Sequence, residues 1–133
     1  EDVREILSLT RAKRNTAAYI PLLIKGVNRN IPVESILFFE QRNHAVMVHT
    51  HAENLRTSQT VKLAHIEPLL PEYFFRCHHS YIVNLRAIRE VDKELQIFIM
   101  QDGSRVHIRQ RDLRKAVLAY ESCLFSGARG GVL

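Results

Sequence analysis

Residues 74–85 read Phe-Phe-Arg-Cys-His-His-Ser-Tyr-Ile-Val-Asn-Leu and mix large apolar side chains with polar ones. A solvated loop would not carry so many apolar residues, and a dry core strand would not carry so many polar ones. If successive residues point to opposite faces, as in a strand, each face carries both apolar and polar side chains. We therefore expect the segment to change structure partway, with polar groups that pin a bend or meet a ligand. Ser80 and Asn84 are residue types that hydrogen-bond nearby backbone at such bends.

The bulk composition is that of one soluble globular domain. The chain has 133 residues, of which 46% are hydrophobic and 25% charged, and it is long enough to bury a core. The net charge is +5, so an anionic partner is plausible, with nucleic acid ahead of an anionic membrane surface. Arginine supplies 14 of the 19 cations, and its planar fork suits phosphate and guanine. Many domains carry a few excess cations, so charge alone decides little.

The cysteines and the N-terminal residues indicate the cellular compartment that we expect. Cys77 and Cys123 do not make a disulfide framework, so a reducing cytoplasm is the expected compartment. No apolar run approaches the roughly 18 residues of a membrane span, and no membrane partner is expected. The first residues, Glu-Asp-Val-Arg-Glu, do not form a signal peptide and lack an initiator Met. We expect a fragment of a longer protein.

The chain divides into three expected parts: a helical connection at 1–15, a domain at 16–125 and a flexible tail at 126–133. Residues 2–14 carry an apolar stripe at helical spacing and are either a docked element or the end of an inter-domain linker. From Ala17 the period changes to that of strands.

Short strands fill most of the domain. The first half predicts a turn at 26–30, one helical turn at Glu34 and Ser35, and strands at 19–25, 31–33, 36–40, 44–51 and 55–60. A helix is expected over 61–70, with Thr60 as its N-cap and with Pro68 ending it near Glu67.

After the central stretch the pattern predicts strands at 87–91, 95–100 and 105–108. Asp102-Gly103 between the last two is a hairpin signal. A last helix is expected over 110–124, with Leu113, Val117, Leu118 and Leu124 on its buried stripe. No strand–helix–strand rhythm indicates a parallel sheet. We therefore predict a mainly β fold of elongated antiparallel sheets, with one mid-chain helix and a C-terminal helix.

Metal binding and catalysis find little support. The pair His49-x-His51 and the run Cys77-His78-His79 offer ligands, but without the spacings typical of zinc sites. Cys77 beside His78 would not form a catalytic pair, because adjacent strand residues point to opposite faces. No nucleophile elbow, phosphate loop or carboxylate pair is present. We expect no enzyme activity, no metal and no cofactor.

Cations gather late in the chain. The span 76–115 holds nine cations against five acids, and several surround the start of the last helix, whose free N–H groups suit a phosphate. The competing interpretation is a solvated face with ion pairs, to which Asp112 would contribute. Charge and pattern place nucleic-acid binding only slightly ahead of a generic interaction module.

Several motifs agree in order and separation with one family. They are residues 31–40 (Ile-Pro-Val-Glu-Ser-Ile-Leu-Phe-Phe-Glu), 69–85, 87–91 (Ala-Ile-Arg-Glu-Val), Asp102-Gly103-Ser104 and the closing helix. Together they resemble the LytTR family, the DNA-binding output domains of bacterial two-component response regulators. The resemblance covers about residues 17–125. It implies an elongated, mostly β fold whose loops, and not a recognition helix, enter successive major grooves.

The resemblance also implies contact residues. By position, His44, His79 and Arg111 would contact bases. Arg111 can fork onto guanine O6 and N7, and a histidine can donate to a base or a phosphate. The expected phosphate contacts, which position the protein without reading sequence, are Arg42, Asn43, Arg76, Arg109, Arg114 and Lys115. Four other residues of the central stretch are expected to be scaffold: Phe74, Ser80, Tyr81 and Asn84.

The leading hypothesis is a sequence-specific module that binds double-stranded DNA and regulates transcription. The resemblance implies an upstream receiver domain and dimers on paired promoter repeats, so the fragment alone is expected to be monomeric and to bind weakly. The main alternative is a non-enzymatic protein-interaction module of the same fold. A third candidate is a binder of RNA or of a membrane surface that uses the same charge without base readout.

Overall fold

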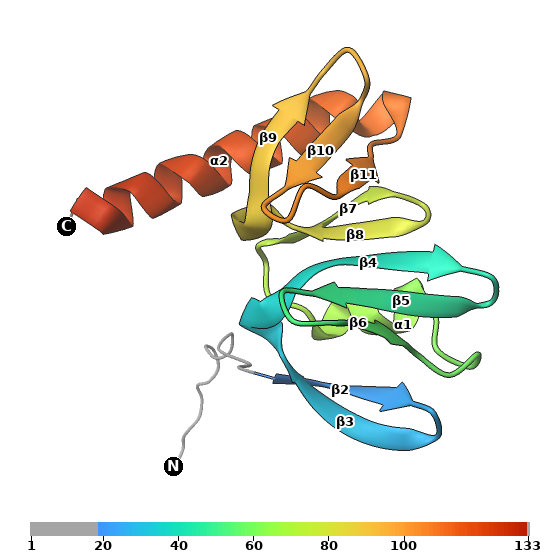
Figure 1. Cartoon of the computed structure of the whole chain (residues 1–133). Coiled ribbons are helices and arrows are strands. Elements are labelled where there is room, and N and C mark those ends of the chain that lie inside the picture. The colour runs from blue at the N-terminus through green and yellow to red at the C-terminus, as the bar shows by residue number, and fades with distance from the viewer. Residues whose placement is uncertain (1–18, 133) are drawn as a thin grey trace.

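The structure, a computed structural model, describes the backbone of residues 19–132 and the side chains of residues 19–125 (Figure 1). The helix expected at 2–14, and with it the connection expected at 1–15, lies outside the described residues.

Three antiparallel sheets lie in successive layers (Figure 1). A two-stranded ribbon joins β2 (Tyr19–Ile24) to β3 (Val27–Pro32). The middle sheet has the strand order β6-β5-β4-β8-β7, which cover Asn54–Arg56, Ala45–Thr50, Ile36–Arg42, Tyr81–Asn84 and Phe74–His78. The third sheet has the order β11-β10-β9, which cover Arg105–His107, Ile97–Met100 and Ile88–Asp92. The predicted mainly β fold is confirmed.

Two helices pack against the sheets. The short α1 (Leu63–Ile66) packs with the ribbon under the middle sheet, and the long α2 (Leu113–Val132) packs against the third sheet (Figure 1). Single 3-10 turns, η1 (Val33–Ser35), η2 (Glu67–Leu69), η3 (Leu85–Ala87) and η4 (Gln110–Asp112), connect the elements. No helix in this part of the chain has both the length and the apolar composition to cross a bilayer.

The middle sheet separates two hydrophobic cores, and its strands β4, β7 and β8 contribute apolar side chains to both of them. Strand β4 shows this most clearly: Ile36 and Phe39 enter the core shared with the ribbon, while Leu37 and Phe38 enter the core shared with α2. Two consecutive residues share a face because the pairing with β5 shifts register between Ile36 and Phe38, as at a β-bulge. A strand buried on both sides explains the unbroken apolar run of the sequence.

The central stretch is a hairpin. Strands β7 and β8 pair antiparallel across a turn at residues 79–80, so the predicted change of structure partway is confirmed. Alternation failed in the sequence because the chain reverses there, and because the pairing shifts register between Phe75 and His78. Asn84 ends the hairpin as a buried polar residue: its Nδ2 donates to the Ile36 carbonyl at 2.9 Å, and its Oδ1 accepts from the Arg86 N–H at 2.9 Å.

Two strand predictions were wrong. Residues 26–30 were expected to be a turn, but β3 begins at Val27, and only Lys25 and Gly26, with φ of 53° and 78°, form the turn. The polar residues of β3 mark an exposed ribbon edge paired on one side only. The strand expected at 55–60 covers Asn54–Arg56, because the Thr57 hydroxyl accepts the Val46 N–H and ends the regular ladder.

The helix expected at 61–70 is also shorter. Its α-helical part begins at Leu63 after Lys62, which makes no side-chain capping bond, and not after Thr60. It ends at Ile66, close to the expected position, and continues as η2, where Pro68 has no N–H to donate.

The last helix differs at its end and on its face. It runs to Val132, where the sequence predicted a flexible tail from Ser126, because extending an existing helix adds a hydrogen bond without the cost of nucleation. The buried stripe consists of Ala116, Val117 and Tyr120, whereas Leu118 and Leu124, expected to be buried, are exposed. Ala116 and Tyr120 belong to the core that α2 shares with the third sheet, and this contact sets the face that the helix buries.

We expect Asn84→Ala to lower the free energy of unfolding by about 1–3 kcal/mol, because it leaves two backbone groups without their partners. Urea denaturation measures the change. Asn28→Ala, at an exposed position of β3, is the matched control and should stay within about 0.5 kcal/mol of the wild type. Equal effects of the two variants would contradict a structural role for the Asn84 amide.

Candidate nucleic-acid interface

Three connections gather at one edge of the molecule: the β4–β5 turn, the β7–β8 turn and the η4 segment that leads into α2 (Figure 1). We call residues 43–44, 79–80 and 110–112 the loop edge. The β2–β3 turn lies on the same side of the molecule (Figure 1).

The β4–β5 turn presents His44 in an uncommon backbone conformation. Asn43 and His44 have φ of 47° and 67°, and both are exposed between the paired residues Arg42 and Ala45. Two successive positive φ values make the tight two-residue turn that suits a hairpin. Asn and His are both among the non-glycine residue types enriched at positive φ, so they suit this turn. Arg56 holds the turn by donating from Nη2 to the Asn43 carbonyl at 3.2 Å.

The β7–β8 turn presents His79, whose side chain is exposed. Arg76 Nη2 donates to the His79 carbonyl at 2.7 Å. The Ser80 N–H donates to His78 Nδ1 at 3.0 Å. This second bond requires an unprotonated Nδ1, so it favours the neutral His78 ring with its proton on Nε2.

Backbone hydrogen bonds tie this hairpin to both flanks. The Gln41 N–H of β4 donates to the Ser80 carbonyl at 2.8 Å. The Arg109 N–H, just before η4, donates to the Cys77 carbonyl at 2.8 Å. The hairpin is therefore the centre of the loop edge, and the three segments are held at fixed relative positions.

The η4 segment presents Arg111. Its side chain is exposed and makes no hydrogen bond or ion pair with the side chains and backbone that the structure describes. The Asp112 N–H donates to the Arg109 carbonyl at 2.8 Å and shapes the turn. A cavity of about 330 Å³ lies between η4 and the β7–β8 turn, and its lining residues are Arg76, His78, His79, Arg109 and Asp112.

The structure thus places the three predicted base-contact residues on separate, exposed turns of one edge. It divides the predicted phosphate contacts into two groups. Arg109 is half-buried and lines the cavity, while Arg114 and Lys115 are exposed on the first turn of α2. Asn43 is exposed in its turn. Arg42 and Arg76, by contrast, are bound to carboxylates of the protein itself.

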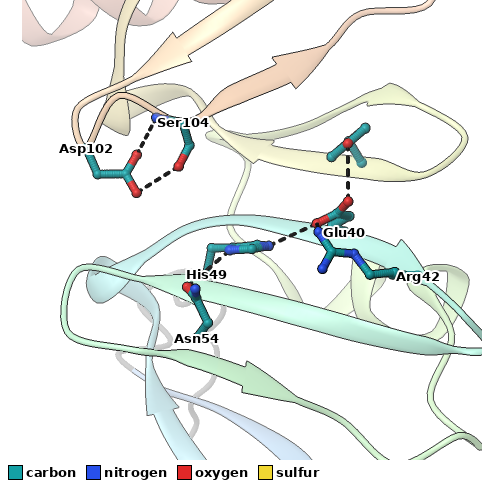
Figure 2. Close-up of polar contacts among 7 residues, drawn as sticks. Glu40, Arg42, His49, Asn54, Asp102 and Ser104 are labelled. Atoms are coloured by element: carbon teal, nitrogen blue, oxygen red, sulfur yellow. Dashed lines mark hydrogen bonds and ion pairs between the residues drawn. The ribbon is translucent and has the colours of Figure 1, made fainter.

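Arg42 belongs to a polar network around Glu40 (Figure 2). Glu40 Oε1 lies 2.9 Å from Arg42 Nη2 and 3.1 Å from His49 Nε2, and Oε2 accepts from the Tyr81 hydroxyl at 3.3 Å. The other His49 nitrogen lies 3.1 Å from Asn54 Oδ1 (Figure 2). Burial, and then the Glu40 charge, raise the pKa of Tyr81. This network joins β4, β5, β6 and β8 across the middle sheet (Figure 2).

The candidate metal ligands do not converge. His49 stacks on Phe38 with ring centroids 4.1 Å apart, while His51 is exposed beside Tyr73 at a different cavity. Within the described residues, no three His, Cys, Asp or Glu side chains come together as a metal ion would require.

Cys77 is unsuited to act as a nucleophile. It is fully buried, and burial raises the pKa of its thiol to about 12. The thiol therefore stays protonated at neutral pH, and a protonated thiol is a poor nucleophile.

The sequence did not indicate two supporting residues, Arg56 and Glu67. Arg56 donates to the carbonyl of Asn43, which lies 13 residues earlier in the chain. Glu67 binds Arg76, which donates to the carbonyl of His79, 12 residues after Glu67. No local pattern signals such a contact, because it depends on how the strands pair.

Comparison with known proteins relates this chain to DNA-binding domains. Residues 27–118 match the family model of the LytTr DNA-binding domain. Accessory gene regulator protein A of Staphylococcus epidermidis is 26% identical over 85 residues, which are 64% of this chain and 35% of that protein. The protein of the same name from Staphylococcus aureus is 24% identical over 104 residues, which are 78% of this chain and 43% of that protein. The chain therefore spans less than half the length of these relatives.

A solved structure shares the fold. It is a LytTr DNA-binding domain from Bacillus cereus, with a TM-score of 0.66 and 22% sequence identity. The match covers 77% of this chain and 95% of that one.

His78 is expected to make stability depend on pH. Burial, together with the nearby His79, His107 and Arg109, lowers the pKa of His78 below its ordinary value of 6.5. The unfolded chain then binds a proton at a higher pH than the folded chain does, so the folded state loses stability as pH falls through about 6.5.

The variant His78→Asn should show a smaller loss of unfolding free energy between pH 7.5 and pH 5 than the wild type. Its amide oxygen can accept the Ser80 N–H without titrating. Urea denaturation at both pH values measures the difference, and the remaining histidines are common to both proteins. The same loss in wild type and variant would show that His78 is not held neutral by the turn.

Proposed function

The chain belongs to the family of LytTr DNA-binding domains, and from that premise we propose that its loop edge reads base sequence in double-stranded DNA. The observation that carries the proposal is the position of His44, His79 and Arg111 on three exposed turns whose backbones are hydrogen-bonded to one rigid sheet. Functional residues on short loops of a rigid scaffold are positioned without a large cost in conformational entropy.

The chemistry of the three side chains suits base edges. The Arg111 guanidinium has no carboxylate partner among the described residues, and it can donate two parallel hydrogen bonds to guanine O6 and N7. His44 and His79 can each donate or accept, and a protonated ring adds attraction to phosphate. Turns that project from one edge fit a model in which loops enter the major groove.

Nearby cations supply affinity that does not depend on sequence. Arg109, Arg114 and Lys115 lie close to η4 in the chain, and we propose that they contact phosphates together with Asn43. Such contacts fix the position of the protein on the duplex, and each one makes the affinity fall with salt.

We further propose that the chain is the output module of a longer transcription regulator, which acts in the cytoplasm by binding DNA and catalyses no reaction. The length of the relatives supports this, since the matched region covers 35% to 43% of proteins named as gene regulators. In the proposed arrangement an upstream receiver domain supplies dimerisation, and two modules bind paired repeats. The isolated module then binds each repeat weakly.

We expect Arg111→Ala to lose about 1–3 kcal/mol of binding free energy on a preferred duplex, and less on a scrambled duplex of the same composition. The preferred duplex is selected from a randomised pool by binding to this chain. Fluorescence anisotropy at several salt concentrations gives both affinities, and the slope against log salt counts phosphate contacts at about 0.9 each.

Arg29→Ala is the control, because Arg29 is exposed on β3 and pairs with Glu53 away from the loop edge. It removes one cation and should change the two affinities alike. Equal losses for Arg111→Ala on both duplexes would make Arg111 a phosphate contact. A wild-type chain that shows no preference among duplexes would overturn the proposed function.

A further inference from the structure

Arg76 is one of the cations expected to contact DNA, but its guanidinium is already engaged inside the protein. Nη1 lies 3.2 Å from Glu67 Oε1, and Nη2 donates to the His79 carbonyl at 2.7 Å. The Arg76 side chain is 32% exposed. Two of the directions in which its fork can donate are therefore used, one by an acid and one by the backbone of the turn that carries a predicted base contact.

The geometry of the guanidinium couples these two bonds. The group is planar and rigid, so the acceptor of one nitrogen fixes the orientation of the other. Glu67 lies on η2, which follows the mid-chain helix α1 and belongs to neither β7 nor β8. The carboxylate thus orients Arg76 from outside the hairpin, and Arg76 in turn holds the His79 carbonyl.

The turn is held at its other residues as well. The His78 ring accepts the Ser80 N–H and stacks on the His79 ring, with centroids 4.3 Å apart and an interplanar angle of 29°. The Ser80 carbonyl is bound by β4 through Gln41. The His79 peptide is the remaining part of the turn, and among the described residues its carbonyl has Arg76 as its donor.

We propose that Glu67 is a positioning residue of the DNA interface: through Arg76 it holds the β7–β8 turn in the orientation from which His79 contacts a base. This rests on the proposed function of the loop edge. The mid-chain helix then has a specific role, because it places η2 and its carboxylate beside the hairpin.

Because Glu67 is acidic, a positioning role and a purely electrostatic role predict opposite changes in DNA affinity when it is removed. A carboxylate near the duplex repels phosphate, so removing it strengthens binding to any DNA if charge is its only effect. Removing a positioning residue instead weakens binding where the turn must match a base, and leaves the sequence-independent part of the affinity unharmed. The two roles therefore predict opposite changes on a preferred duplex.

The experiment measures the affinity of the Glu67→Ala variant of this chain for the preferred duplex and for the scrambled duplex, by fluorescence anisotropy. We expect a loss of about two- to fivefold on the preferred duplex, the range of a half-exposed ion pair. Affinity for the scrambled duplex should be unchanged or slightly higher.

Glu72→Ala is the matched control. Glu72 is exposed on the connection between η2 and β7, and no hydrogen bond or ion pair joins it to the described residues. Its replacement should raise both affinities equally or change neither. Thermal unfolding of both variants close to that of the wild type shows that the fold is intact.

A second variant separates positioning from phosphate contact. Arg76→Lys keeps the charge but replaces the fork with a single ammonium group. If Glu67 acts on the turn through Arg76, this variant also lowers the ratio of the affinity for the preferred duplex to that for the scrambled duplex. The double variant with Glu67→Ala then has nearly the same ratio as Arg76→Lys alone. If Arg76 contacts phosphate, Arg76→Lys keeps the ratio, and the two substitutions act independently.

The outcomes distinguish this proposal from the one on which it rests. A wild-type chain without sequence preference overturns the proposed function itself. A wild-type chain with a clear preference, together with a Glu67→Ala variant that behaves as Glu72→Ala does, overturns the positioning role alone.

Discussion

Two backbone hydrogen bonds hold the loop edge together. The Cys77 carbonyl accepts from Arg109 and the Ser80 carbonyl from Gln41, so the hairpin β7–β8 is joined to the approach of η4 on one side and to the end of β4 on the other. They add to the pairing of β4 with β8, which already places the β4–β5 and β7–β8 turns in one sheet, and the bond from Arg109 joins the approach of η4 to that sheet. A peptide group is a suitable anchor because its donor and acceptor directions are fixed by the backbone and not by a flexible side chain.

The two cores explain why this edge is rigid. Strands β4, β7 and β8 of the middle sheet contribute to both cores, one shared with the ribbon and α1 and the other shared with the third sheet and α2 (Figure 1). Close packing on both faces leaves the strands little freedom, so the turns at their ends inherit defined positions. The network around Glu40 adds polar links between strands where the apolar core ends (Figure 2).

Cations of this protein serve two purposes that a count of charges does not separate. Arg42 and Arg76 bind the carboxylates of Glu40 and Glu67, and Arg76 also donates to the carbonyl of His79 in the β7–β8 turn. Arg111 and its neighbours in η4 and α2 are turned to solvent and are available to phosphate and bases. In the proposed interface Glu67 therefore has an organising role, although its charge reduces the attraction for DNA.

The sequence by itself determined the features that depend on neighbouring residues: the antiparallel β class, the hairpin at Asp102-Gly103 and the bend within the central stretch. Asp102 accepts from Ser104 within two residues, so a local pattern was enough to reveal that turn. The sequence did not reveal that His44 lies in a turn or that Arg111 lies in a 3-10 turn, since these residues were expected in a strand and in a helix. Only the tertiary structure decided the true start of β3, the rotation of α2, and whether a given arginine faces solvent or a carboxylate. Those outcomes depend on which strands pair and on which side chains meet across a sheet, and a hydrogen bond such as that between Arg76 and Glu67 exists only once the chain has folded.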